Sequence, residues 1–256
     1  MRAVERFPGS ARGRRRLPFE ILYEDRDVIV IDKPAGLLTT HTKVVGRAAR
    51  EAQLTAENLL NDYVRKGQLK SRNRVWLVHR LDRETSGVMM FAKSEEVAEY
   101  FRANWNGLTE KTYVAKVQGE LKEQNGVFES FLQEDADGYR VRSVGVGGSR
   151  GPRSSSDSRT PKFARTEWKL LSSIPHSPFP VPHSPSPIPF SLVEVFLKSG
   201  RKNQIRVHFS EAGHPVVGDV KYGGPKSDRL YLHAFRLRFR HPHTDEWMSF
   251  ESPSPF

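Results

Sequence analysis

Cysteine is absent from this chain of 256 residues, so disulfide bonds, thiolate metal sites and cysteine nucleophiles are excluded. Long apolar runs are also missing, since no stretch approaches the eighteen or more apolar residues that a membrane helix needs. The first eighteen residues carry six arginines and no apolar segment, which argues against an ordinary signal peptide. The sequence therefore predicts a cytoplasmic protein without a membrane partner.

Acidic residues are in the minority, with 30 Asp and Glu against 41 Lys and Arg, for a formal net charge of +11. This excess predicts a polyanionic partner, and nucleic acid is the commonest one, although a protein can also be basic for no such reason. None of the nine histidines has the spacing of a zinc site. His241-Pro242-His243 is interpreted as a surface turn, so we expect no bound metal.

Three segments differ in composition from the rest of the chain. Residues 1–18 are predicted to be a disordered basic arm, because their arginines repel one another and nothing nearby can be buried. Mobile insertions are expected near residues 145–162, rich in Gly, Ser and Arg, and near residues 173–191, which hold seven of the seventeen prolines. Residues 19–250 are otherwise predicted to form one folded domain.

Hydrophobic periodicity predicts helices and strands in mixed order. A helix over residues 55–66 is capped by Thr55 and ended by Gly67, and a second helix begins at Ser94. A short third helix covers residues 201–212 and ends at Gly213. Strands are expected over residues 19–23, 28–31, 75–78, 88–92, 113–117, 163–171, 192–198 and 231–239. The predicted fold class is α+β, with a large mixed, mostly antiparallel sheet flanked by helices.

The most informative motif is His79-Arg80-Leu81-Asp82-Arg83-Glu84-Thr85-Ser86-Gly87, between two predicted apolar strands. It places the carboxylate of Asp82 among three cationic or potentially cationic side chains, those of His79, Arg80 and Arg83. A polar loop between buried strands is costly to position, and is therefore a candidate for chemistry. The structural alternative is that Asp82 pairs with Arg80 or caps the Thr-Ser-Gly turn.

Three more blocks accompany this motif: Lys33-Pro34-Ala35-Gly36, Lys111-Thr112-Tyr113, and Gly200-Arg201-Lys202-Asn203-Gln204-Ile205-Arg206-Val207-His208. In this order, over roughly residues 19–245, the four blocks make the chain resemble the RluA-type family of RNA pseudouridine synthases. Asn203 stands where that family usually has His, which we interpret as a change in a supporting residue. The Lys33 block comes too early to leave room for the small N-terminal RNA-binding (S4) module of many members.

The resemblance implies the pseudouridine synthase fold and an enzyme that isomerises specific uridines of structured RNA, ribosomal or transfer. Uracil leaves C1′ of its ribose, turns, and is rejoined through C5. No atom enters or leaves overall, so neither a cofactor nor a metal is expected. The implied partner is RNA, and we expect the enzyme to act as a monomer.

The resemblance also assigns the catalytic residues. Asp82 is the expected catalytic carboxylate, which either stabilises or traps positive charge at C1′ or acts as a base at C2′; the sequence leaves both open. Tyr113 supplies an aromatic face on which the detached base can turn, and its hydroxyl helps to remove the C5 proton. Arg206 is the expected partner that keeps Asp82 ionised.

Four further residues are candidates for substrate binding. Arg80 is expected to fill the space that a flipped-out uridine leaves. Leu232 is a candidate for an apolar wall opposite Tyr113. Lys33 and Arg201 are candidate contacts to the RNA backbone.

Other classes of function fit the sequence less well. The main alternative is a non-catalytic RNA-binding protein that retains the fold, but binding alone would not require Asp82, Tyr113 and Arg206 together. A glycoside hydrolase or nucleosidase would usually need a second catalytic carboxylate, and Glu84 is not compelling in that role. A DNA-binding protein is disfavoured, since neither a helix-turn-helix nor a zinc signature is present.

Deletion of residues 1–17 is predicted to weaken RNA binding more at low salt than at high salt, without moving the modified position. Each phosphate neutralised by an arginine contributes about −0.7 to −0.9 to the slope of log affinity against log salt. The deletion should therefore flatten this slope by a few units, which titrations at three or more salt concentrations would measure. An unchanged slope would show that the arm does not touch RNA.

Overall fold

The computed structural model describes residues 17–41, 54–66, 68, 71–136, 138–144, 160–174 and 189–256. Nearly all of the predicted basic arm and most of both predicted insertions therefore lie outside the described residues. The chain divides into two compact units, one of Met1–Thr109 with Ala234–Ser254 and one of Glu110–His233 with Pro255–Phe256. The single domain expected over residues 19–250 stays a prediction.

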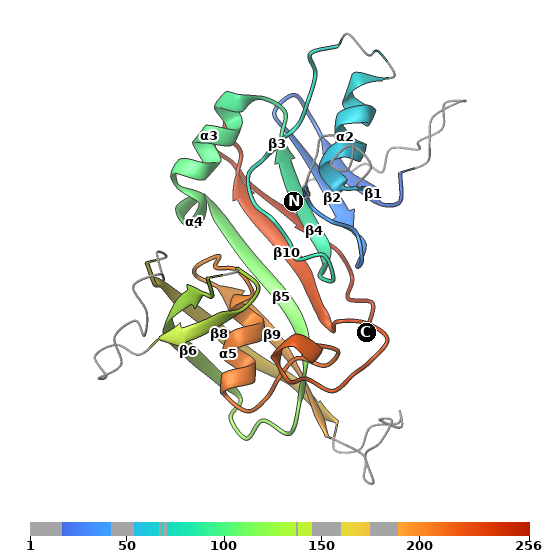
Figure 1. Cartoon of the computed structure of the whole chain (residues 1–256). Helices are drawn as coiled ribbons and strands as arrows, with labels where there is room; N and C mark the ends of the chain where they lie inside the picture. The colour runs from blue at the N-terminus through green and yellow to red at the C-terminus, as the bar shows by residue number, and fades with distance from the viewer. Residues whose placement is uncertain are drawn as a thin grey trace. The chain divides into compact units, whose positions relative to one another are not determined.

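The first unit is built on two long antiparallel strands (Figure 1), β2 (Val28–Lys33) and β4 (Ser86–Ala92), which pair from Val28 with Ala92 to Lys33 with Gly87. All seven residues of β4 are buried, as the unbroken apolar run predicts for a strand covered on both faces. The remaining strands of this unit pair around them: β1 (Glu20–Glu24) with β2, β3 (Trp76–Leu77) with β4, and β11 (Trp247–Glu251) with β10 (Leu232–Arg240).

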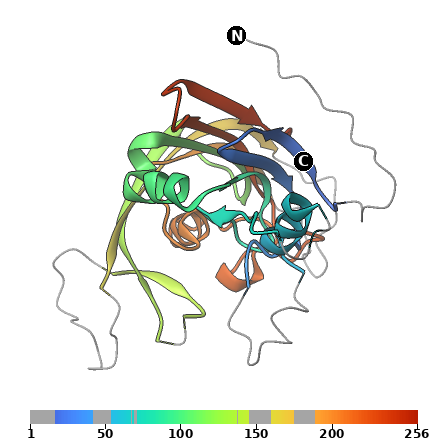
Figure 2. The same cartoon turned by 90° about the horizontal axis from the view of Figure 1, so that it is seen from above.

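Among its described residues, the first unit has three helices: α2 (Ala56–Arg65), α3 (Glu95–Ala103) and α4 (Trp105–Leu108). The last two follow each other closely (Figure 2). Both predicted N-caps are confirmed, since Thr55 accepts a hydrogen bond from the backbone N–H of Asn58 and Ser94 accepts one from Val97. α2 ends on Lys66 in a left-handed conformation, at φ 52°. Gly67, the predicted end, lies outside the described residues.

The core of the first unit fills the space between α3 and the sheet. Phe101 of α3 is fully buried and meets Phe239 of β10 edge-on, with ring centroids 5.8 Å apart. Burial of one such side chain stabilises the fold by about 1.5–3 kcal/mol. The buried members of this core are Val28, Val30, Val88, Met90, Ala92, Val97, Ala98, Phe101, Leu237, Phe239 and Phe250.

The second unit is an antiparallel sheet in the order β5-β9-β8-β6-β7. Its strands are β5 (Thr109–Gln118), β6 (Asn125–Glu134), β7 (Val141–Val144), β8 (Lys162–Ile174) and β9 (Phe190–Leu197). The helix α5 (Gln204–Glu211) contacts β7 and β8, and a 3-10 turn, η1 (Val220–Tyr222), contacts α5.

The predicted fold class is confirmed: few helices accompany a large, mostly antiparallel arrangement of strands. The strand expected over residues 75–78 shrinks to the two residues of β3. β6, β7, β11 and α4 were not predicted. β6 shows why: its less exposed alternating positions are Gly126, Phe128 and Ser130, of which only one is apolar and large, so the strand has no clear apolar alternation. Among the described residues, no helix is long and apolar enough to cross a membrane.

Candidate active site

Asp82 lies in the loop between β3 and β4 of the first unit, where its side chain is half-buried. The backbone N–H of Thr85 donates to the carbonyl of Asp82 at 3.2 Å and closes a turn. Leu81, immediately before Asp82, is buried and anchors one side of the loop. The carboxylate thus stands at the end of a short loop that enters the fully buried strand β4.

The loop is held on both sides of Asp82 by the segment that follows β2. The hydroxyl of Thr39 donates to the carbonyl of Leu81 at 2.8 Å and accepts from its N–H at 3.3 Å. The N–H of Gly36 donates to the carbonyl of Arg83 at 2.8 Å. Because these bonds fix the residues before and after Asp82, they limit where its carboxylate can point.

Lys33 completes this support from within the protein. Its side chain is fully buried, and Nζ donates to the carbonyls of Pro34, Leu37 and Arg83 at 2.9, 2.8 and 3.2 Å. These bonds use all three donors of the ammonium group. The geometry therefore argues against the predicted contact between Lys33 and the RNA backbone, and gives Lys33 a role in supporting the Asp82 loop.

His79 contributes packing rather than charge. Its Nε2 accepts a hydrogen bond from the N–H of Met90 at 3.1 Å, which requires a lone pair on that nitrogen. The ring stacks on Trp105, with centroids 4.7 Å apart. The structure thus favours a neutral His79, in contrast to the potential cation considered from the sequence. Arg80 and Arg83 are both exposed.

Gly87, the last residue of the motif, is required by a close approach of chain segments. Its φ is +113°, and a Cβ atom there would lie 2.2 Å from the carbonyl oxygen of Ala234 in β10. Any other residue would push these backbones apart.

The remaining candidates belong to the second unit. Tyr113 lies in β5 opposite Val195 of β9 and is 9% exposed. Leu232 begins β10 and is buried. Arg201 is exposed, and its Nε donates to the carbonyl of Phe163 at 3.0 Å.

Arg206 forms a two-bond ion pair with Asp219, a residue to which the sequence interpretation assigned no role. Nε and Nη2 of Arg206 donate to the two carboxylate oxygens of Asp219 at 2.6 and 2.7 Å. Both residues are buried, and a bidentate pair fixes the plane of the guanidinium as well as its position. The position of Asp219 in Gly218-Asp219, shortly after the Arg206 block, was the only signal in the sequence.

Asn203 is part of the same network. It stands before α5 in a left-handed conformation, at φ 53°, which Asn tolerates better than most residues. Its Oδ1 accepts from Nη1 of Arg206 at 3.2 Å, and its Nδ2 donates to the hydroxyl of Tyr222 at 3.0 Å. These contacts are consistent with a supporting role for Asn203 at the position where the family usually has His.

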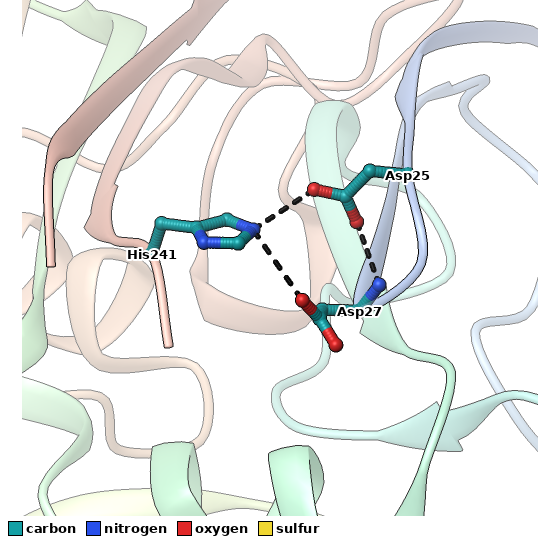
Figure 3. A group of neighbouring side chains, drawn as sticks. All are labelled: Asp25, Asp27 and His241. Atoms are coloured by element: carbon teal, nitrogen blue, oxygen red, sulfur yellow. Dashed lines mark hydrogen bonds and ion pairs between the residues drawn. The ribbon is translucent and has the colours of Figure 1, made fainter. Parts of the chain in front are cut away.

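One cluster in the first unit has side chains of the kind that bind metals. Asp25, Asp27 and His241 offer ligand atoms within 4.8 Å of one another (Figure 3). However, Nδ1 of His241 accepts from the N–H groups of His243 and Thr244, at 3.4 and 3.3 Å. The proton of the neutral ring therefore lies on Nε2, which donates to Asp25 at 2.8 Å and is not available as a metal ligand.

The same cluster has a structural explanation as a link between two turns. Oδ1 of Asp25 accepts from the N–H groups of Asp27 and Val28, at 2.7 and 2.8 Å, and closes the turn between β1 and β2. Burial acts to raise the pKa of Asp25, but these hydrogen bonds and that from His241 outweigh it and lower the pKa. The cluster thus ties this turn to the turn that follows β10, and its donor chemistry does not fit a metal.

Comparison with known proteins gives the class of the protein. A sequence model described as RNA pseudouridylate synthase matches residues 27–211. The chain is 34% identical over 242 residues to tRNA pseudouridine synthase C of Vibrio parahaemolyticus, covering 89% of this chain and 87% of the relative. It is 31% identical over 251 residues to ribosomal large subunit pseudouridine synthase D of Nitrosomonas europaea, covering 93% and 63%.

A solved structure agrees with this class. Human RNA Pseudouridylate Synthase Domain Containing 1 superposes with a TM-score of 0.65 at 26% identity, covering 97% of this chain and 86% of that one. The chain therefore belongs to the RluA family of RNA pseudouridine synthases. It is an isomerase, and membership of this family implies an RNA substrate.

The burial of Lys33 predicts a specific dependence of stability on pH. Burial lowers the pKa of Lys33 from 10.5 to about 8, although Glu84 and Asp82 act to raise it. Between these two values the unfolded chain binds more protons than the folded one, so the free energy of unfolding should rise with pH. At 1.36 kcal/mol per pKa unit, this rise amounts to about 3 kcal/mol at most. Replacement of the lysine by methionine, Lys33→Met, should abolish it.

Urea unfolding of both proteins at pH 7.5 and pH 10 would measure the difference. The control is Lys198→Met, because the side chain of Lys198 is 55% exposed. An equal rise in the wild type and in Lys33→Met would contradict the prediction.

Proposed function

We propose that this protein converts specific uridines of structured ribosomal or transfer RNA to pseudouridine, with Asp82 as the reacting carboxylate. The observation that carries the proposal is the support of the Asp82 loop, whose backbone is hydrogen-bonded on both sides of Asp82 to the Lys33–Thr39 segment. Such preorganisation is what a reacting group needs. Since the relatives carry the names of both a transfer-RNA and a ribosomal enzyme, both substrate classes stay within the proposal.

The proposed reaction begins with cleavage of the bond between C1′ and N1 of the uridine. Asp82 either adds to C1′ and holds the sugar covalently or removes a proton from C2′; both routes need its ionised form. The freed uracil turns and forms the C1′–C5 bond, while the bond between Asp82 and C1′ breaks on the first route and Asp82 returns its proton to C2′ on the second. C5 then loses its proton and N1 gains one. Atoms balance without any cofactor, so the proposal includes none and requires no metal.

Tyr113 and Arg206 are assigned supporting chemical roles in this proposal. The ring of Tyr113 provides the surface on which uracil turns, and its hydroxyl helps to remove the C5 proton. Arg206 is assigned to the carboxylate of Asp82 as its cationic partner. Its own bidentate pair with Asp219 supports this role, because a guanidinium held in one plane loses less conformational entropy when it binds a second group.

Three residues are assigned to contacts with the substrate RNA. Arg80 is assigned to the space that the flipped uridine leaves, and its exposure is compatible with that role. Leu232 is proposed as an apolar wall and Arg201 as a phosphate contact. Lys33 is not assigned such a contact, because its buried ammonium group donates to three backbone carbonyls.

Release of tritium from RNA labelled at C5 of uridine tests the activity directly, because the C5 proton is lost in every productive turnover. A non-catalytic RNA-binding protein would bind such RNA and release nothing. Mapping pseudouridines in RNA from cells with and without the protein would then identify the RNA and the position.

Asp82→Asn is predicted to abolish tritium release while leaving the fold and RNA affinity nearly intact. The amide keeps the shape of the side chain but cannot act as a charged nucleophile or base. Glu84→Gln, in the same loop and exposed, is the matched control and should stay active. More than a few per cent of wild-type activity in Asp82→Asn would exclude Asp82 as the reacting group.

Tyr113→Phe is predicted to bind RNA about as well as the wild type but to turn over much more slowly, because stacking survives and the hydroxyl is lost. Tyr113→Ala should weaken RNA binding as well, by about 1–3 kcal/mol, which is typical of one base stacked on an aromatic ring. Single-turnover rates and binding titrations separate the two effects, with Tyr100→Phe as the control. Full activity of Tyr113→Phe would leave the ring with a stacking role only.

A further inference from the structure

The turn between β6 and β7 presents an aromatic ring among basic side chains. Tyr139 is 63% exposed, and Nζ of Lys221 lies 4.4 Å from the centroid of its ring. Lys221 also donates to the carbonyl of Tyr139, while Nη2 of Arg140 donates to the carbonyl of Lys221 at 2.8 Å. These contacts tie the turn to η1, so the exposed ring is presented from a supported segment.

A pocket of about 410 Å³ adjoins this turn. Its lining includes three cations, Lys162, Arg201 and Lys202, and one carboxylate, Glu134. Lys202 pairs with Glu134 at 3.0 Å and also donates to the carbonyl of Gly138, the residue before Tyr139. Lys202 therefore joins the pocket to the turn that carries Tyr139.

Positive charge is crowded around this pocket. The buried residue Lys111 lies next to it, since a Cβ on the lining residue Gly200 would be 4.0 Å from Nζ of Lys111. Burial, and to a smaller extent the charge of Arg201, lower the pKa of Lys111 to about 8. Cations that destabilise one another in this way are stabilised by a bound anion.

We propose that Tyr139, Lys221 and the pocket around Lys162 and Arg201 form a subsite for single-stranded RNA outside the reacting uridine. A phosphate occupies the cationic pocket and an unpaired base stacks on Tyr139. The combination of an exposed aromatic ring with a neighbouring basic groove is the arrangement by which proteins hold single strands. The proposal rests on the proposed function for its RNA partner, and adds where a part of that RNA is held.

Equilibrium binding of the full-length protein to a twelve-residue oligocytidine tests the subsite, because cytidine cannot be isomerised to pseudouridine. A twelve-residue abasic strand provides the same phosphates without bases. Tyr139→Ala should weaken oligocytidine binding about 5- to 150-fold, the range expected for loss of a base stack, and leave abasic binding and the salt slope unchanged. Tyr139→Phe should bind as the wild type does.

Loss of a cation should instead affect the oligocytidine and the abasic strand alike. Lys162→Ala should weaken the binding of both strands. It should also flatten the slope of log affinity against log salt by about 0.7, because one phosphate contact is lost. Two matched controls should change neither quantity. They are Trp247→Ala, an exposed ring under Arg238 in the other unit, and Lys198→Ala, a half-exposed lysine paired with Glu167.

Several results would overturn the subsite. They are an unchanged affinity of Tyr139→Ala, an equal loss for the abasic strand, or no binding of oligocytidine by the wild type at any salt concentration. If Tyr139→Ala lost affinity for an acidic peptide of matched charge but kept its affinity for oligocytidine, the surface would be assigned to a protein partner instead. Tritium release by the wild type is measured separately, so failure of the subsite and failure of the proposed function give different results.

Discussion

The Asp82 loop depends on a fully buried ammonium group. Burial of a charge is costly unless its hydrogen-bonding groups are satisfied, and Lys33 meets this condition with three backbone carbonyls. The carbonyls of Pro34 and Leu37 belong to the segment that follows β2, and the carbonyl of Arg83 belongs to the Asp82 loop. The ammonium group of Lys33 therefore holds these two segments together. The position of the proposed reacting carboxylate is thus set by a residue that never needs to touch substrate.

The second unit uses a similar device for a different group. Arg206 is held by the buried carboxylate of Asp219 and by Asn203, and Asn203 is in turn bonded to Tyr222. In both units a charged side chain is oriented by buried partners before any substrate arrives. Exposed cations lie elsewhere, at Lys162, Arg201 and Arg80, where the polyanionic partner of a basic protein would be expected.

Local patterns in the sequence predicted the elements that are stabilised locally. Thr55 and Ser94 cap their helices as expected, and the unbroken apolar run of β4 is a strand buried on both faces. β6 and β7 are not predicted because most of their side chains are exposed or only partly buried, and their stability comes from pairing with β8 and with each other. Such pairing is a property of the sheet, and no pattern within either strand encodes it.

The four sequence blocks by themselves determined the family, the isomerase activity and the candidate residues Asp82, Tyr113 and Arg206. Only the tertiary structure decided what each charged group contacts. It buried Lys33, favoured a neutral His79, and paired Arg206 with Asp219. The physical reason is that a motif specifies which side chains are present, whereas their charge state and orientation depend on partners such as Arg83, fifty positions from Lys33 along the chain.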